Sequence, residues 1–201
     1  MGRTSDARER LIDEAGRLFH TRSYEGVGVQ ELCEAAGINK GSFYHFFKSK
    51  DDLAAAVIDA QWEAVRDELL APTLADDVAP LARIERFFER LARDQRAARR
   101  DLGVTPGCPL ANLSGELCTH VPKLRRKLAR VFDGMRDALE KTLCDAVSAG
   151  ELPRGTDASR GAEALVALAE GALLLSAAHD DPALVGRVGR LALGLVGAPA
   201  R

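Results

Sequence analysis

The stretch Gly28–Phe47, GVQELCEAAGINKGSFYHFF, decides the fold of the first part of the chain. Its apolar residues recur at helical spacing in two short runs, which Gly37, Ile38 and Asn39 separate. Gly37 suits the left-handed conformation that ends a helix, and Asn39 is a favoured N-cap for the helix that follows. The stretch therefore predicts a helix, a three-residue turn and a second helix. This is the layout of a helix-turn-helix, whose second helix enters the major groove of DNA.

The second of these helices has two different faces. At 100° per residue its three phenylalanines, Phe43, Phe46 and Phe47, form one apolar face. The opposite face carries a cation, a glycine and two amphipathic rings: Lys40, Gly41, Tyr44 and His45, with Ser42 at the border. Tyrosine and histidine can donate to phosphates or base edges, and glycine allows a close approach of the backbone. We expect this second face to contact nucleic acid.

The start of the next helix adds cationic residues. Ser49 is expected to cap it, with Asp52 three residues later as in a capping box. Lys50 then lies in the first turn, where the helix dipole disfavours a cation, and Lys48 lies just before it. A lysine there is better explained by an external anion such as a phosphate. The alternative is a three-helix cluster that binds no DNA, in which these are ordinary surface residues.

The segment Tyr24–Leu53, YEGVGVQELCEAAGINKGSFYHFFKSKDDL, closely resembles the DNA-binding region of TetR-family transcriptional regulators, and with the helix before it the resemblance covers about residues 5–55. It implies that the groove or the phosphates are contacted by Gln30, Lys40, Gly41, Ser42, Tyr44, His45, Lys48 and Lys50. The family often has hydroxyl residues where this chain has Val27 and Gly28. A hydroxyl contact and a cap are therefore expected to be missing there.

Helical periodicity continues through the remaining chain, and Pro109 and Pro122 each suit the first turn of a helix. The fourth helix is expected to end before Pro72. The sequence predicts an all-α fold of about nine helices: an N-terminal three-helix helix-turn-helix domain (1–50) and a C-terminal helical domain (51–201). The arginine-rich run 83–100 is expected to form solvated pairs along a helix.

The resemblance implies that the C-terminal part binds an effector and forms a dimer. The stretch 161–178 is apolar almost all round and must be buried, while Leu184, Val188, Leu191 and Leu195 form one stripe of the last helix. These helices either complete the core of a monomer or form a four-helix bundle with a second copy. We favour a homodimer, because two reading heads then meet a palindromic operator.

The residues expected to line a small-molecule effector site combine apolar and polar side chains. They are Trp62, Phe87, Phe88, Cys108, Asn112, Glu116 and Met135. Each of them is equally well explained as an ordinary core or surface residue.

Cys108 lies between a glycine-containing loop and Pro109, at a predicted helix N-terminus that favours a thiolate. The segment Gly107–Leu117 also resembles one in some TetR-family members that sense electrophiles or oxidants through a cysteine. The alternative is that Cys108 is only a small buried residue.

The net charge of −2 and the pI near 6.1 are unusual for a DNA-binding protein, but residues 38–50 hold three lysines and no acid. No phosphate loop, nucleophile motif or metal-ligand cluster is present, so we expect neither an enzyme nor a bound metal or cofactor. The four cysteines lack CxxC spacing, and no signal peptide or confident membrane span is seen. We expect a cytoplasmic, effector-responsive regulator, most often a repressor in this family. The alternatives are an all-α enzyme and an architectural DNA-binding protein.

Overall fold

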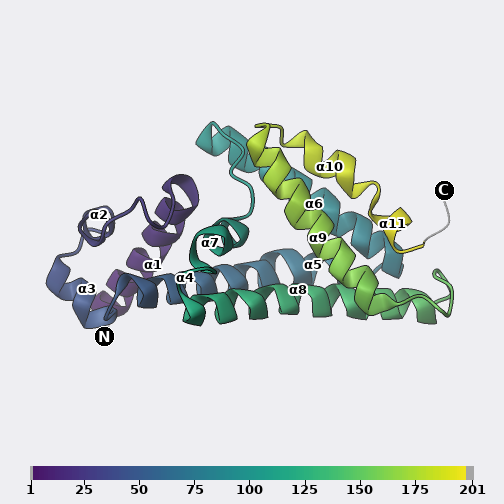
Figure 1. Ribbon diagram of the computed structural model, residues 1–201, viewed down its shortest axis with the longest axis horizontal. Helices are drawn as coiled ribbons and strands as arrows, with labels where there is room; N and C mark the ends of the chain where they lie inside the picture. The colour runs from purple at the N-terminus through teal and green to yellow at the C-terminus, as the bar shows by residue number, and fades with distance from the viewer. Residues whose placement is uncertain (1, 198–201) are drawn as a thin grey trace. The chain divides into compact units, whose positions relative to one another are not determined.

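The computed structural model describes residues 2–197, and the side chains from residue 6 onward. Within this range the chain forms helices and no strand, which confirms the all-α prediction (Figure 1). The elements are α1 (Gly2–Arg22), α2 (Val29–Ala35), α3 (Lys40–Phe46), α4 (Lys50–Ala64), a π-helical segment (Val65–Leu70), α5 (Ala71–Thr73), α6 (Pro80–Leu102), α7 (Pro109–Leu117), α8 (Pro122–Ser148), α9 (Ala158–Ala178), α10 (Ala183–Gly189) and α11 (Ala192–Leu195). Helices α7 and α8 begin at the two prolines, as predicted.

The chain divides into two compact units. The first unit takes in the chain up to Glu63 together with Pro109–Ala129, and the second takes in Ala64–Cys108 together with the chain after Ala129. The first unit thus contains α7 and the beginning of α8 as well as the helix-turn-helix segment. The predicted functional boundary between residues 50 and 51 stays a prediction.

The first unit is built on α1, which packs against α2 and, across a long sequence separation, against α7. Its core is made of apolar side chains that are almost completely buried, among them Leu11, Phe19, Leu32, Phe43 and Leu53. The phenylalanine face predicted for α3 provides part of this core. Burial of that face leaves the opposite face of α3 available to a partner.

The second unit is organised around α10, which packs against both α6 and α9 (Figure 1). Gly189 of α10 lies so close to α6 that a Cβ there would lie 2.7 Å from the Cβ of Phe88. A larger residue would force the two helices apart, so the glycine permits the close packing of this pair.

Pro72 does not end the fourth helix, so this expectation is wrong. The helix runs through the π-helical segment into α5 and ends after Thr73. The Ala71 amide donates to the Arg66 carbonyl, five residues earlier, and this wider turn changes how the helix approaches Pro72. The lone amide that proline lacks is thereby accommodated without a break in the helical path.

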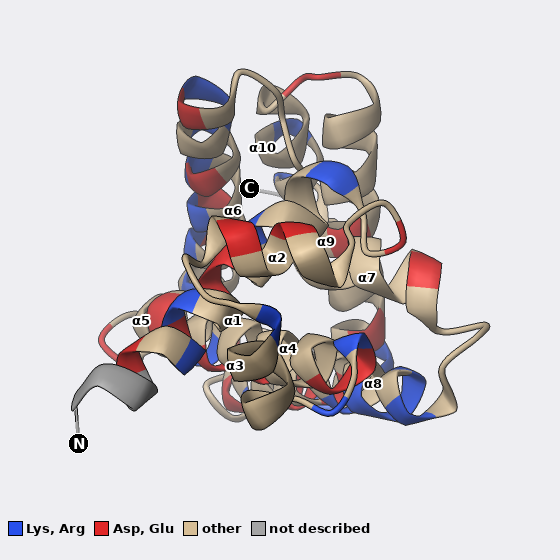
Figure 2. Cartoon of the chain, turned by 90° about the vertical axis from the view of Figure 1, so that its left-hand side faces the viewer, with Lys and Arg blue, Asp and Glu red and all other residues tan. Residues whose placement is uncertain are grey.

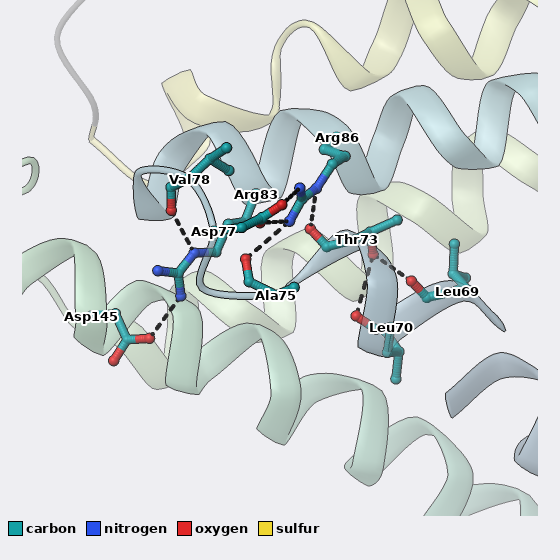
Figure 3. Close-up of polar contacts among 9 residues, drawn as sticks. All are labelled: Leu69, Leu70, Thr73, Ala75, Asp77, Val78, Arg83, Arg86 and Asp145. Atoms are coloured by element: carbon teal, nitrogen blue, oxygen red, sulfur yellow. Dashed lines mark hydrogen bonds and ion pairs between the residues drawn. The ribbon is translucent and has the colours of Figure 1, made fainter. Parts of the chain in front are cut away.

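Helix α6 carries basic and acidic residues in alternation along its length (Figure 2). Two of its arginines depart from the expected solvated pairs and instead hold the turn before the helix (Figure 3). Arg83 is buried, donates to the Val78 carbonyl at 2.8 Å and forms an ion pair with Asp145 at 3.2 Å. Arg86 donates to the carbonyls of Thr73 and Ala75 at 2.7 and 2.9 Å. The buried guanidinium keeps its hydrogen bonds, which explains its tolerance inside the unit.

Helix α9 is only partly buried inside one chain. Leu165 and Leu173 belong to the core, whereas Leu174 and Leu175 are 64% and 48% exposed. By length and mean hydropathy alone α9 could span a membrane, a property that core helices of soluble proteins share. The expectation that this helix is buried all round is therefore wrong for the single chain.

Candidate nucleic-acid interface

The turn between α2 and α3 has the predicted geometry. Gly37 has a φ of +64°, and the Ile38 amide donates to the Cys33 carbonyl at 2.9 Å, which closes the end of α2. The Asn39 side chain accepts a hydrogen bond from the Ser42 amide at 2.8 Å and caps α3. The turn thus fixes the direction in which α3 leaves α2.

The face of α3 opposite the phenylalanines is exposed to solvent. Phe43 and Phe47 are 0% and 5% exposed, whereas Tyr44 is 57% exposed. Lys40, Gly41 and His45 are also exposed. An exposed tyrosine of this kind has no packing role on its own chain, and its ring and hydroxyl are free to meet a base edge or a phosphate.

The other predicted DNA contacts lie around this face with differing freedom. Ser42 is half-buried and Lys48 is exposed. Gln30 is exposed on α2 and donates to Glu34 at 2.7 Å. Gly28 precedes α2 without a side-chain cap, in agreement with the missing hydroxyl. Their contacts with DNA stay predictions.

Lys50 has partners within the chain that the sequence does not predict. Its ammonium donates to the carbonyls of Tyr24 and Val27 at 2.9 and 3.0 Å, and it lies 4.1 Å from the centre of the Tyr24 ring. Lys50 thereby ties the start of α4 to the segment between α1 and α2. Two of its three N–H donors are in use, so a phosphate contact has one donor left, and that contact stays a prediction.

The Tyr24 side chain forms part of the same connection. Its hydroxyl donates to the carboxylate of Asp51, and its ring packs edge-on against Phe19 with centroids 5.1 Å apart. Burial, followed by the bond to Asp51, raises the pKa of the Tyr24 phenol far above its ordinary value. Tyr24 therefore stays protonated and remains a hydrogen-bond donor at any physiological pH.

Glu116 on α7 holds the same segment from the other side. Its two carboxylate oxygens accept hydrogen bonds from the backbone amides of Tyr24 and Glu25, each at 3.1 Å. The sequence placed Glu116 in the effector set, because nothing local links it to residues more than ninety positions earlier. The structure adds this role in holding the DNA-reading unit together.

Surface charge on the first unit is unevenly distributed. Helix α3 carries few charged residues, whereas the first turns of α8 carry several cations (Figure 2). Lys123 pairs with Asp52 at 2.9 Å, and Lys127 pairs with Asp59. The first of these contacts lowers the pKa of Asp52. Because they neutralise two acids of α4, these lysines reduce the negative charge of the reading unit.

The seven predicted effector residues are divided between the two units. Trp62, Asn112 and Glu116 belong to the first unit, and Phe87, Phe88, Cys108 and Met135 belong to the second. Phe87, Phe88 and Met135 are buried, and the two phenylalanine rings meet edge-to-face at 5.3 Å. Trp62, Cys108 and Asn112 are half-buried. Their role in binding an effector stays a prediction.

Phe88 lines a cleft of about 370 Å³ in the second unit, together with Glu85, Glu89, Gly186, Gly189, Arg190 and Leu193. The walls come from α6, α10 and the segment around α11. Over residues 2–197, no group of three or more His, Cys, Asp or Glu side chains is placed to hold a metal ion.

Comparison with known proteins gives consistent matches to both parts of the chain. A family described as bacterial regulatory proteins, tetR family, matches residues 11–57, and one described as tetracyclin repressor-like, C-terminal domain, matches residues 80–192. The chain is 34% identical over 169 residues to the transcriptional regulator AcuR of Cereibacter sphaeroides, which covers 84% of this chain and 75% of that protein.

A second relative and a solved structure show the same likeness. Identity to the HTH-type transcriptional repressor DhaR of Mycobacterium sp. strain GP1 is 27% over 175 residues, or 87% of this chain and 83% of that one. The crystal structure of a regulatory protein TetR from Rhodobacter sphaeroides superposes with a TM-score of 0.81 at 29% identity, covering 92% of this chain and 96% of that chain. The first helix-turn-helix unit and the helical C-terminal region therefore have counterparts in proteins of one kind.

Proposed function

The chain belongs to the TetR family of bacterial transcriptional regulators, and we propose that it is a homodimeric repressor that a small-molecule effector releases from a palindromic operator. Members of this family bind operator DNA and act as dimers. The repressor role is supported by the relative DhaR, which is named a transcriptional repressor. The chain is proposed to act in the cytoplasm, without a cofactor.

The exposed face of α3 is the observation that carries the proposal. It offers Lys40, Gly41, Tyr44 and His45 to solvent on a helix whose other face is locked into the core. A cation and two ring donors on a short helix match the groups that read base edges and phosphates in the major groove. Gln30, Ser42, Lys48 and Lys50 are proposed to contribute from its borders.

Exposed leucines support dimerisation through the C-terminal unit. Leu174 and Leu175 of α9, Leu191 beside α11 and Leu195 within it are all about half exposed or more. Leaving this much apolar surface in water costs free energy, which a second copy would recover on burying it. A twofold dimer would also place two α3 helices on successive half-sites of the operator.

The effector is proposed to bind among the predicted residues of the helical region. Phe87, Phe88 and Met135 supply apolar surface there, and Trp62 and Asn112 are half-buried. An effector that binds one dimer conformation better than the other would shift the population away from the state that fits the operator. The alternative signal is an electrophile or oxidant that reacts with Cys108.

Selection of DNA from a randomised pool, followed by quantitative binding, tests the proposal. A regulator of this kind selects one palindromic sequence, and the logarithm of its affinity falls linearly with the logarithm of salt concentration. An architectural protein would enrich no single palindrome, which would contradict the proposal. Release of the selected DNA by small molecules from cell extract then tests the effector part separately.

A further inference from the structure

The loop before α7 is fixed firmly onto the second unit. The Gln95 side chain of α6 donates to the Gly107 carbonyl and accepts from the Gly107 amide, both at 3.1 Å. Asp180 accepts from the amide and the hydroxyl of Thr105, each at 2.9 Å. Cys108, the next residue after Gly107, is therefore held in a defined position rather than on a loose loop.

This loop lies directly against α9. A Cβ on Gly107, whose φ is +75°, would lie 3.3 Å from both the Ala177 Cβ and the Leu173 carbonyl oxygen. The absent side chain permits this close approach. The Cys108 thiol consequently comes within hydrogen-bonding reach of the Glu170 carboxyl, which lies about one turn earlier on α9.

Glu170 itself lacks the partners that a buried carboxyl normally has. Both of its carboxyl oxygens are buried, and neither accepts a hydrogen bond from an N–H or O–H group of residues 6–197. Burial raises the pKa of Glu170, and the nearby thiol of Cys108 lowers it by a smaller amount. No lysine, arginine or histidine of the described chain contributes to this pKa.

An uncompensated buried carboxyl is costly, and such a group calls for an explanation beyond packing. Paired with a thiol, it can take the thiol proton, so that a single negative charge is shared between sulfur and oxygen. A thiolate is the reactive form of cysteine, and a buried carboxyl is a stronger base than an exposed one. The arrangement therefore suits proton transfer from sulfur to Glu170.

We propose that Cys108 and Glu170 form a modification site for soft electrophiles that carry a carbon–carbon double bond conjugated to a carbonyl, with Glu170 as the general base. The Glu170 carboxylate takes the thiol proton as sulfur forms a bond to the β-carbon and the π bond breaks. The protonated Glu170 then returns that proton to the α-carbon. The product is a thioether, and no oxidant or reductant is consumed.

The inference rests on the proposed function only for its consequence, because a bulky thioether at Cys108 would be the signal that alters operator binding. The attachment point lies in a loop that packs between α6 and α9. An added group there must displace side chains of a close-packed region.

The test measures alkylation of the full-length protein by N-ethylmaleimide, with peptide mass mapping to follow each cysteine separately. Exposed Cys144 is the control within the same molecule. We expect Glu170→Gln to slow alkylation of Cys108 by at least about tenfold while the rate at Cys144 stays the same. In the parent, the Cys108 rate should also fall less steeply than the Cys144 rate as pH decreases from 8 to 6, and Glu170→Gln should remove this difference.

Equal Cys108 rates in the parent and in Glu170→Gln would overturn the proposal, as would identical pH profiles for the two cysteines of the parent. A merely structural role for Glu170 would change accessibility at all pH values equally and leave the shape of the profile unaltered. Operator binding by the alkylated parent and by Cys108→Ser separates the two levels. If Cys108 reacts with help from Glu170 and the modified protein still holds its operator, the signalling role fails and the site chemistry stands.

Discussion

The Glu116 carboxylate accepts a hydrogen bond from the Tyr24 backbone amide at 3.1 Å, across 92 positions of sequence. The bond joins α7 to the segment between α1 and α2, and Lys50 holds the carbonyl of the same Tyr24 from the side of α4. The amide and the carbonyl of one residue are therefore both fixed by side chains of other helices. The position of this segment, and with it the start of the helix-turn-helix, depends on these charged groups.

Glu116→Ala should lower the free energy of unfolding by about 1–3 kcal/mol, because two backbone amides lose a charged acceptor. Urea denaturation measures the loss, and Glu163→Ala, at an exposed position of α9, is the matched control. Equal stability of the two variants would show that water replaces the carboxylate without cost.

Lys50→Met should also destabilise the protein, by about 1–2 kcal/mol, because the carbonyls of Tyr24 and Val27 lose their donor while the aliphatic stem is kept. Lys48→Met, at an exposed neighbouring position, should leave stability unchanged. Thermal unfolding of both variants decides the matter. A Lys50→Met protein as stable as the parent would mean that Lys50 is free to serve DNA alone.

Signals between near neighbours explain which of these features the sequence could predict. The Gly37 turn, the Asn39 cap and the prolines that begin α7 and α8 depend on a few adjacent residues, and all four were predicted. The amphipathic pattern of α3 likewise predicted its exposed face, because burial of phenylalanine leaves only one orientation.

Contacts between residues distant in sequence explain what the sequence could not predict. Glu116 carries no local sign that it binds Tyr24, and the approach of Cys108 to Glu170 depends on how the 103–108 loop packs on α9. Pro72 was misjudged because a π-helical turn, which has no recognisable sequence signal, changes the usual penalty. The effector residues are uncertain for the same reason, since a cavity is a property of packing.

Leu191→Asp should convert the protein to a monomer, because it places a charge on an apolar residue that is 64% exposed and proposed to face a second copy. Sedimentation equilibrium should then report a mass near 21.6 kDa, the mass of one chain. Leu102→Asp, at the end of α6, makes the same change on a residue that is 44% exposed and should remain dimeric. Dimers in both variants would exclude Leu191 from the interface.

Asp180→Asn should destabilise the protein at neutral pH and matter less in acid. The pKa of Asp180 lies well below its ordinary value, chiefly because of Arg99, with further help from Thr105. Since the folded-state pKa is depressed, the stabilisation is present above the unfolded-state value and is lost as pH falls below about 4. Urea denaturation at pH 7 and at pH 3 should show the difference from the parent shrinking. A difference of the same size at both pH values would contradict the ion-pair explanation.

Fluorescence anisotropy with the selected operator tests the central claim most directly, by comparing the parent with Tyr44→Ala, Lys40→Ala and the control Lys141→Ala on the second unit. The first two substitutions should each weaken operator binding by about tenfold, with dimer mass and melting temperature unchanged. The control should bind like the parent. If all three variants bind the operator as the parent does, the exposed face of α3 is not the DNA-reading surface.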